Sequence, residues 1–107
     1  MVTRLPANYE AYVSSGALTE GSVEGEPGYF VLWPLDEIAQ NNADVDIQKY
    51  APGFVAFGGN GGGELLAFDR TGAVVMLPMI GLDVQHAIKI AESWEAFEKR
   101  ICETGKP

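Results

Sequence analysis

The residues most open to a chemical role lie in the glycine-rich segment 58–63, GGNGGG, and in Glu64, which follows it. Glycine loops beside strands bind phosphate in two well-known patterns. One requires Lys and then Ser or Thr after the last glycine, and the other requires glycines at the first, third and sixth positions before a helix. The segment has neither pattern, and the Glu64 carboxylate would repel a phosphate. We therefore interpret the segment as a structural turn and predict no nucleotide and no other cofactor.

Few other side chains have the neighbours that catalysis or metal binding needs. His86 is the single histidine, and Cys102, the single cysteine, has no base close to it in the sequence. A zinc site needs three or four ligands, and a cysteine nucleophile needs a base. The run Asp44-Val45-Asp46 lacks the glycine and distal glutamate of a calcium loop. We therefore predict no metal site and no enzyme activity, and expect Cys102 on a helix face.

The acidic residues are unevenly distributed along the chain. No Lys or Arg occurs between Leu5 and Gln48, a stretch that holds eight Asp and Glu residues. The rest of the chain carries equal numbers of acidic and basic side chains, so the net charge of −8 belongs to the first half. Such a surface repels nucleic acid and anionic membranes and attracts basic proteins. The alternative is that the charge only maintains solubility.

Length and composition indicate one globular domain, residues 1–107. The expected location is the cytoplasm, for the reasons that follow. No apolar stretch of 18 residues is present, so no membrane span is expected. The first six residues, MVTRLP, lack the apolar region of a signal peptide. A single cysteine allows no internal disulfide, which fits a reducing compartment.

Apolar runs bounded by glycine, proline or aspartate predict the strands. The runs on either side of the glycines, 54–57 and 65–68, are typical of strands buried on both faces. The glycines between them either let another backbone approach closely or present their own amide groups, and the sequence leaves both open. Further strands are expected at 29–33 and 73–77, with Gly72 at a positive-φ turn position before the latter.

Short helices are expected in the first half. Pro6 in the first turn and Gly16 just past the end predict a helix between them, with one apolar face. That face consists of Leu5, Tyr9, Tyr12 and Val13. The polar residues 17–28 predict a loop, residues 35–39 a short helix, and residues 41–49 a second helical turn.

The C-terminal segment 83–101 fits one long helix or a broken one. Apolar residues at nearly helical spacing occur throughout it, at Val84, Ala87, Ala91, Trp94, Phe97 and Ile101. Ser93, followed by acidic residues, is a good N-cap, which favours a separate helix from Trp94 to Glu103 that ends at Gly105. Trp94 and Phe97 are then expected in the core.

Four segments, taken together, match the motif order of a known family. LPANYEAYVSSGA resembles its opening, and YFVLWPLDEIAQNN is similar to its strand, helix start and following Asn. AESWEAFEKRI is similar to its ending, with Trp94 for the usual Phe and Ala96 where Glu is common. The most specific segment, FVAFGGNGGGELLAFD, resembles the core motif of the SUKH superfamily, the group named for the yeast cell-wall assembly regulator. The residues that match this core motif are Phe57, Gly58, Gly61, Gly62, Gly63, Glu64, Phe68 and Asp69.

The resemblance implies a single-domain α+β fold, with a bent, mostly antiparallel sheet and helices packed around it. It also implies a non-enzymatic role, because bacterial members resemble immunity proteins that neutralise toxins, often nucleases, and yeast members act as regulatory hubs. Members usually carry another helix before the Leu-Pro, which is expected to be missing here. Loss of that helix would expose apolar surface and permit a homodimer.

The resemblance and the charge distribution lead to one hypothesis about binding. We expect an acidic surface to attract the basic substrate groove of a toxin, where carboxylates mimic phosphates. The carboxylates expected to do so are Glu20, Glu24, Glu26, Asp36, Glu37, Asp44 and Asp46. Tyr29 and Trp33 could anchor a partner if exposed, but core packing is the expectation for both. The alternatives are a regulatory interaction module without a toxin partner and, as the weakest hypothesis, a carboxylate-based enzyme.

Overall fold

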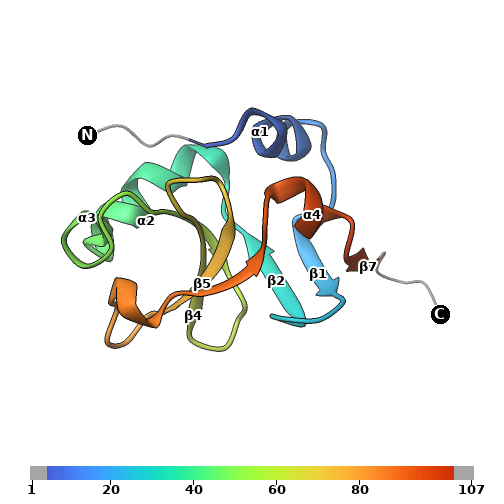
Figure 1. Ribbon diagram of the computed structural model, residues 1–107. Helices are drawn as coiled ribbons and strands as arrows, with labels where there is room; N and C mark the ends of the chain where they lie inside the picture. Colours follow the sequence, from blue (N-terminus) through green and yellow to red (C-terminus); the bar gives the residue numbers. More distant parts are fainter. Residues whose placement is uncertain (1–4, 103–107) are drawn as a thin grey trace.

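Residues 5–102 are described by the computed structural model, and they form one curled antiparallel sheet with short helices around it (Figure 1). The strand order is β6-β5-β4-β3-β2-β1-β7. The expected α+β class with a bent antiparallel sheet is therefore confirmed. The strands are β1 (Glu20–Val23), β2 (Tyr29–Leu32), β3 (Val55–Gly59), β4 (Glu64–Phe68), β5 (Val74–Pro78), β6 (Ile88–Ala91) and β7 (Ile101–Cys102). The helices are α1 (Ala7–Ser14), η1 (Leu35–Glu37), α2 (Ile38–Asp44), α3 (Ile47–Tyr50), η2 (Val84–His86) and α4 (Trp94–Glu98).

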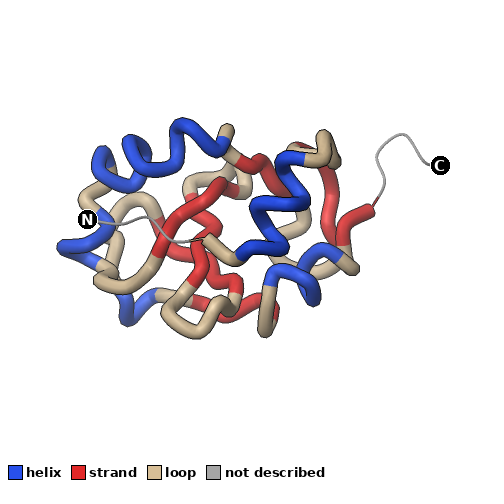
Figure 2. Tube along the Cα trace, turned by 90° about the horizontal axis from the view of Figure 1, so that it is seen from above, coloured by secondary structure: helices blue, strands red, loops and turns tan. Residues whose placement is uncertain are grey.

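The sheet is buried on both faces in its middle. Side chains of β4 alternate between two apolar clusters: Leu66 and Phe68 belong to the first, and Leu65 and Ala67 belong to the second. Strand β5 alternates in the same way. Helices α1 and α4 cover the first cluster, and Figure 2 shows these helices lying across the strands when the molecule is seen from above. The prediction that the strands around the glycines are buried on both faces is thus confirmed.

Aromatic rings fill the first cluster. The Tyr9 ring of α1 meets the Trp94 ring of α4 edge to face, with centroids 4.8 Å apart. Phe57 of β3 stacks on Phe68 of β4 at 4.2 Å, and Phe97 lies beside Trp94. Offset and edge-to-face contacts add roughly 1 kcal/mol each to the burial of these rings. The expected apolar face of α1 and the expected core role of Trp94 and Phe97 are both confirmed.

Residues 17–28, expected to be a loop, contain a strand instead. Strand β1 pairs with β2, with Glu20 opposite Val31 and Ser22 opposite Tyr29. Glycine and glutamate have low strand propensity, so the segment looks polar in sequence. Its side chains nevertheless alternate: Gly21 and Val23 are buried, and Glu20 and Ser22 are exposed. Pairing with β2 outweighs the local propensity.

The C-terminal segment also departs from the expectation, because residues 88–91 form strand β6 rather than helix. Ile88 pairs with Met76 on β5, so backbone bonds to the sheet replace helical ones. Ser93 does cap a new helix, since its hydroxyl accepts a hydrogen bond from the Ala96 amide at 3.1 Å. That helix ends at Glu98, not at Glu103, because the chain then joins β1 as strand β7. The expected stop at Gly105 lies outside the described residues.

Cys102 belongs to β7, so the expectation that it lies on a helix was wrong. The expected helical turns around residues 35–49 are present as η1, α2 and α3. Helix α2 is held to the sheet by Asn42, whose buried side-chain amide donates to the Ala56 carbonyl and accepts from the Ala56 amide, both at 2.8 Å. Asn42 therefore satisfies the backbone of β3 where its pairing with β4 shifts register.

Strands β2 and β3 approach each other very closely at Gly58. A Cβ atom at this position would lie 2.2 Å from the Val31 carbonyl oxygen and 3.1 Å from the Leu32 Cα. Both neighbours are backbone atoms, which cannot move aside as a flexible side chain can. Of the two roles that the sequence left open for the glycines, Gly58 has the first: it admits another backbone.

The turn between β4 and β5 is held by Asp69. One oxygen of its carboxylate accepts hydrogen bonds from the Thr71 amide at 2.8 Å, the Thr71 hydroxyl at 2.6 Å and the Ala73 amide at 3.0 Å. Burial raises the pKa of the Asp69 carboxyl, but these hydrogen bonds and the charge of Lys89 outweigh it, so the pKa lies below its usual value. Gly72 has φ +90°, as expected for this turn.

Replacing Gly58 with Ala should destabilise the protein by roughly 3 kcal/mol, because the methyl group forces β2 away from β3. Urea unfolding at pH 7 measures the effect. Gly62→Ala is the matched control, since a Cβ there would lie 3.6 Å from the nearest atom, an ordinary contact. It should cost less than about 1 kcal/mol. Equal losses in the two variants would show that the close approach does not limit the residue at position 58.

Replacing Asp69 with Asn should destabilise the protein by roughly 1 kcal/mol at pH 7, because the bonds at this partly exposed turn lose their charge. A carboxyl whose pKa is lowered by folding stabilises the folded state above its unfolded pKa, and loses that effect as pH falls through the folded pKa. The difference between the two proteins should therefore shrink below about pH 4. Thermal unfolding at several pH values tests this, and a difference independent of pH would contradict it.

Candidate partner-binding surface

The expected acidic residues are all exposed, but they lie in two groups. The first group, which we call the hairpin acids, is on β1 and the turn that follows it: Glu20, Glu24 and Glu26. The second, which we call the helix acids, runs from η1 to the start of α3: Asp36, Glu37, Asp44 and Asp46. In Figure 1 the turn between β1 and β2 lies at the lower right and α2 at the upper left, so the two groups occupy different parts of the surface.

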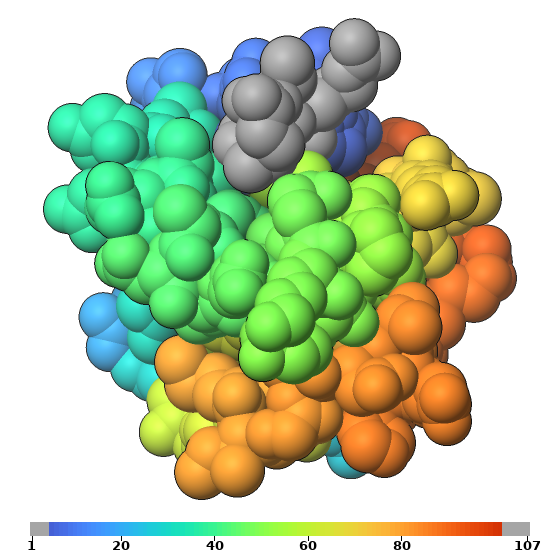
Figure 3. All heavy atoms as spheres, turned by 90° about the vertical axis from the view of Figure 1, so that its left-hand side faces the viewer, coloured from blue at the N-terminus to red at the C-terminus, as the bar shows by residue number. Residues whose placement is uncertain are grey.

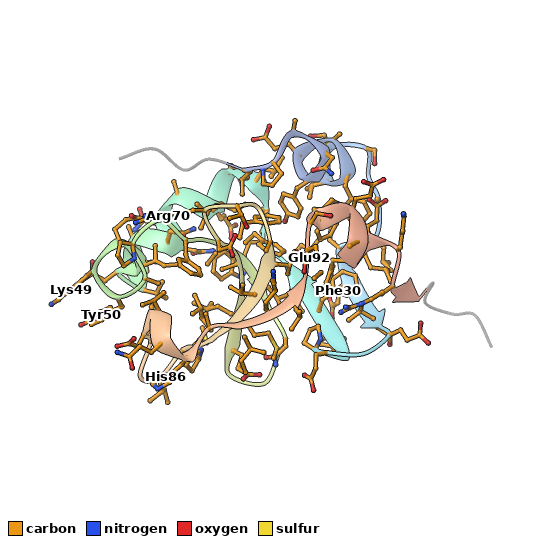
Figure 4. All side chains as sticks on the ribbon, in the orientation of Figure 1. Phe30, Lys49, Tyr50, Arg70, His86 and Glu92 are labelled. Atoms are coloured by element: carbon orange, nitrogen blue, oxygen red, sulfur yellow. The ribbon has the colours of Figure 1, made fainter. Side chains whose placement is uncertain are left out.

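Neither group is neutralised by ion pairs within the described part of the chain. The ion pair found there joins Lys89 to Glu92, which lie in the C-terminal half. Lys49 follows the helix acids in the sequence, and its ammonium group lies over the Tyr50 ring, 5.3 Å from the centroid. Figure 4 shows both of these side chains at the outer left edge of the molecule. The helix acids are thus available to an outside cation, whereas the Arg100 guanidinium lies beside the hairpin acids, because it donates a hydrogen bond to the Glu26 carbonyl oxygen.

Tyr29 is exposed to 39% and connects the hairpin acids to the glycine-rich turn. Its hydroxyl donates a hydrogen bond to the Glu20 carboxylate. This bond, together with desolvation and the Glu20 charge, raises the pKa of the Tyr29 hydroxyl. The ring lies against Gly61, where a Cβ atom would be 3.3 Å from it. The expectation that Tyr29 packs in the core was wrong, because its place in β2 turns the ring outward.

The glycine-rich turn is organised by Asn60. Its side-chain oxygen accepts from the amides of Gly62 at 2.8 Å and Glu64 at 3.2 Å, and its side-chain nitrogen donates to Glu64 Oε1 at 2.8 Å. Gly61 and Gly63 have φ of +75° and +100°, values that side-chain-bearing residues rarely adopt. The turn therefore holds the Glu64 carboxylate in a defined position.

A shallow groove of about 350 Å³ lies beside this turn. Val31 of β2, Trp33 just after that strand and Glu64 of β4 all line it. The remaining lining residues are Gly59, Gly61, Gly63, Leu65 and Met79. Trp33 is half-buried and packs against both apolar clusters, so the expectation of core packing holds for only part of its ring. Met79 is fixed next to the turn by the bond from its amide to the Gly63 carbonyl, 2.9 Å long.

A second hollow, of about 300 Å³, shares Met79 with the groove. Its other lining residues are Val45, Tyr50, Gly81 and Leu82. Figure 3 shows the face concerned, on which the green segment around α3 and the orange segment after β5 lie side by side. Ile80, which follows Met79, is 93% exposed. Single exposed apolar side chains are common on protein surfaces, so Ile80 by itself does not identify a contact surface.

The core-motif residues have structural positions. Phe57 and Phe68 are buried in the first cluster, Gly58 admits β2, and Asp69 closes the turn after β4. Gly61, Gly62 and Gly63 form the turn, and Glu64 is the one charged residue that the motif brings to the groove. Sequence patterns gave no sign of the groove itself, because Trp33, Glu64 and Met79 come from separate segments that only the sheet brings together.

Among the described residues, no group of three or more His, Cys, Asp or Glu side chains is placed to hold a metal ion. His86 is exposed, with its ring nitrogen 3.3 Å from the Gly81 carbonyl oxygen, and Figure 4 places it at the lower edge, away from Glu92. No described helix is long and apolar enough to cross a bilayer.

Comparison with sequence models of protein families identifies a relationship. The sequence model of the SMI1 / KNR4 family (SUKH-1) matches residues 1–100, which is most of the chain. No curated protein sequence matches the chain significantly. The match includes α1, the glycine-rich turn with Asn60 and Glu64, and helix α4 with its Ser93 cap. By this match, the chain belongs to the SMI1 / KNR4 family (SUKH-1) of the SUKH superfamily.

Proposed function

We propose that this domain is an immunity protein, which binds a basic toxin of the nuclease type and occludes its substrate groove. The family is one of protein-interaction and immunity-type domains, and the choice among these roles depends on the surface. The observation that carries the proposal is the set of seven exposed carboxylates that form no ion pair with described residues. Carboxylates so placed present to a nuclease the negative charge that its substrate phosphates would present.

Within each group, the acids differ in whether their carboxylate already accepts a hydrogen bond. Asp44 and Glu20 already accept hydrogen bonds, from Gln40 at 2.8 Å and from Tyr29. Glu24, Glu26, Asp36 and Glu37 have no side-chain hydrogen bond to any described residue. These four carboxylates can turn toward a cation without giving up an internal bond. They are therefore the best positions at which to test the charge contribution.

Charge complementarity acts mainly on the rate of encounter, and salt screens it. We expect association with the basic product of an adjacent gene to slow at least tenfold between about 0.05 and 0.5 M NaCl. The double variant that carries Glu24→Lys and Glu26→Lys, or the one that carries Asp36→Lys and Glu37→Lys, should slow association by a similar factor at low salt. Stopped-flow or surface-based kinetics measures both effects, and protection of cells that express the toxin measures the function.

Glu95→Lys with Glu98→Lys is the matched control, because both residues are exposed on α4 and undergo the same change of charge. This control should retain rapid association and protection. Comparison of the two acidic doubles then shows which group faces the partner. An association rate that is insensitive to salt and to all three double variants would contradict the proposed electrostatic attraction. A regulatory interaction module would then be the better description of this domain.

A further inference from the structure

We propose that the groove beside the glycine-rich turn is a binding site for an arginine side chain of the protein partner. The inference rests on the proposed function, since it names the group of a basic partner that this chain would hold. The groove differs from the two groups of surface acids because its one carboxylate lies among apolar side chains. Val31, Trp33 and Met79 line it together with Glu64.

The Glu64 side chain is half-buried, and hydrogen bonds hold its carboxylate in place. Asn60 donates to its Oε1 at 2.8 Å and also accepts from the Glu64 amide, so both the side chain and the backbone of Glu64 are fixed. Its other oxygen, Oε2, forms no hydrogen bond with the described residues. A carboxylate that is already held in place, with one oxygen free, binds a cation at little further cost in side-chain conformational entropy.

The other lining groups suit the rest of an arginine side chain. Trp33 offers part of its ring, on which a guanidinium can stack, and Met79 and Val31 offer apolar surface to the methylene groups. Gly59, Gly61 and Gly63 add no side chains, so the backbone forms the floor of the groove. No Lys or Arg lines the groove, so an incoming cation meets no like charge.

Charge argues against two other occupants of the groove, a second copy of this chain and an apolar side chain of a partner. A second copy of this chain carries the same net charge of −8 and would be repelled. A purely apolar side chain would cover the Glu64 carboxylate without pairing it, which is costly. An arginine satisfies the carboxylate and covers the apolar wall in one group. The volume, about 350 Å³, lies near the lower end of the range for binding pockets, which fits one long side chain.

The test uses the whole chain and a small probe, N-acetyl-arginine methylamide, followed by amide and indole NMR shifts. We expect saturable shifts at Gly59, Gly61, Gly63 and the Trp33 indole, with millimolar affinity. The citrulline analogue, which has the same shape without the charge, should cause no such shifts. Glu64→Gln should weaken binding of the arginine probe about tenfold, because the amide keeps its partner Asn60 but loses the charge. Glu95→Gln, at an exposed site on α4, should bind like the natural chain.

Each outcome decides the inference independently of the proposed function. Equal shifts with arginine and citrulline, shifts confined to the surface acids, or no shifts at all would overturn it. An unchanged spectrum of Glu64→Gln outside the groove shows that this variant folds, so lost binding cannot come from unfolding. If the probe binds the groove but the lysine doubles do not slow the toxin, the groove stands and the proposed function fails. If the lysine doubles slow association with the toxin but the probe does not bind the groove, the proposed function stands and the inference about the groove fails.

Discussion

The architecture depends on the narrow junction between β2 and β3. Two residue pairs, Val31 with Gly59 and Leu32 with Gly58, join the part of the sheet formed by β7, β1 and β2 to the part formed by β3, β4, β5 and β6. One more bond, from the Trp33 amide to the Phe57 carbonyl at 2.9 Å, extends the junction. Because so few bonds connect the two parts of the sheet, the missing side chain at position 58 determines whether the sheet is continuous.

The same junction creates the groove. When β2 lies this close to β3, Val31 and Trp33 come beside the glycine-rich turn that leads from β3 to β4. The turn can be short and still place Glu64 in a fixed position, because Asn60 supplies bonds that glycines cannot. A residue set that resembles a phosphate loop in composition thus presents a carboxylate instead of amide groups. The proposed chemistry of the site is that of a cation receptor.

Sequence patterns predicted the centre of the fold better than its edges. The strands around the glycines, the Gly72 turn and the Ser93 cap follow from local rules, because burial on both faces and turn chemistry leave few alternatives. Strands β1 and β6 lie toward the two ends of the sheet and have four residues each, so β1 shows no clear apolar pattern and the alternation Ile88-Lys89-Ile90 of β6 is too short to distinguish a strand from a helix. Their conformation is decided by pairing with a neighbour that lies far along the chain or is itself buried.

The candidate site was predicted in the same uneven way. The charge of the first half of the chain is visible in the sequence, and so is the motif that includes Glu64. The separation of the acids into two groups on the surface is not, because it depends on where the turn after β1 and helix α2 lie around the sheet. The expectation that Tyr29 lies in the core was wrong because an aromatic residue in a strand can face either side of the sheet. Its alternation with the buried Phe30 becomes clear only once the sheet is formed.

Burial on both faces of β4 and β5 has a consequence for how such a domain can change. Every side chain from Leu65 to Phe68 contacts one cluster or the other, so almost any polar substitution there breaks the core. The acids lie on β1, the turn that follows it, and the short helices, where substitution disturbs little packing. Residues at the periphery can therefore change without disturbing the framework, which is the property that the proposed immunity role would require.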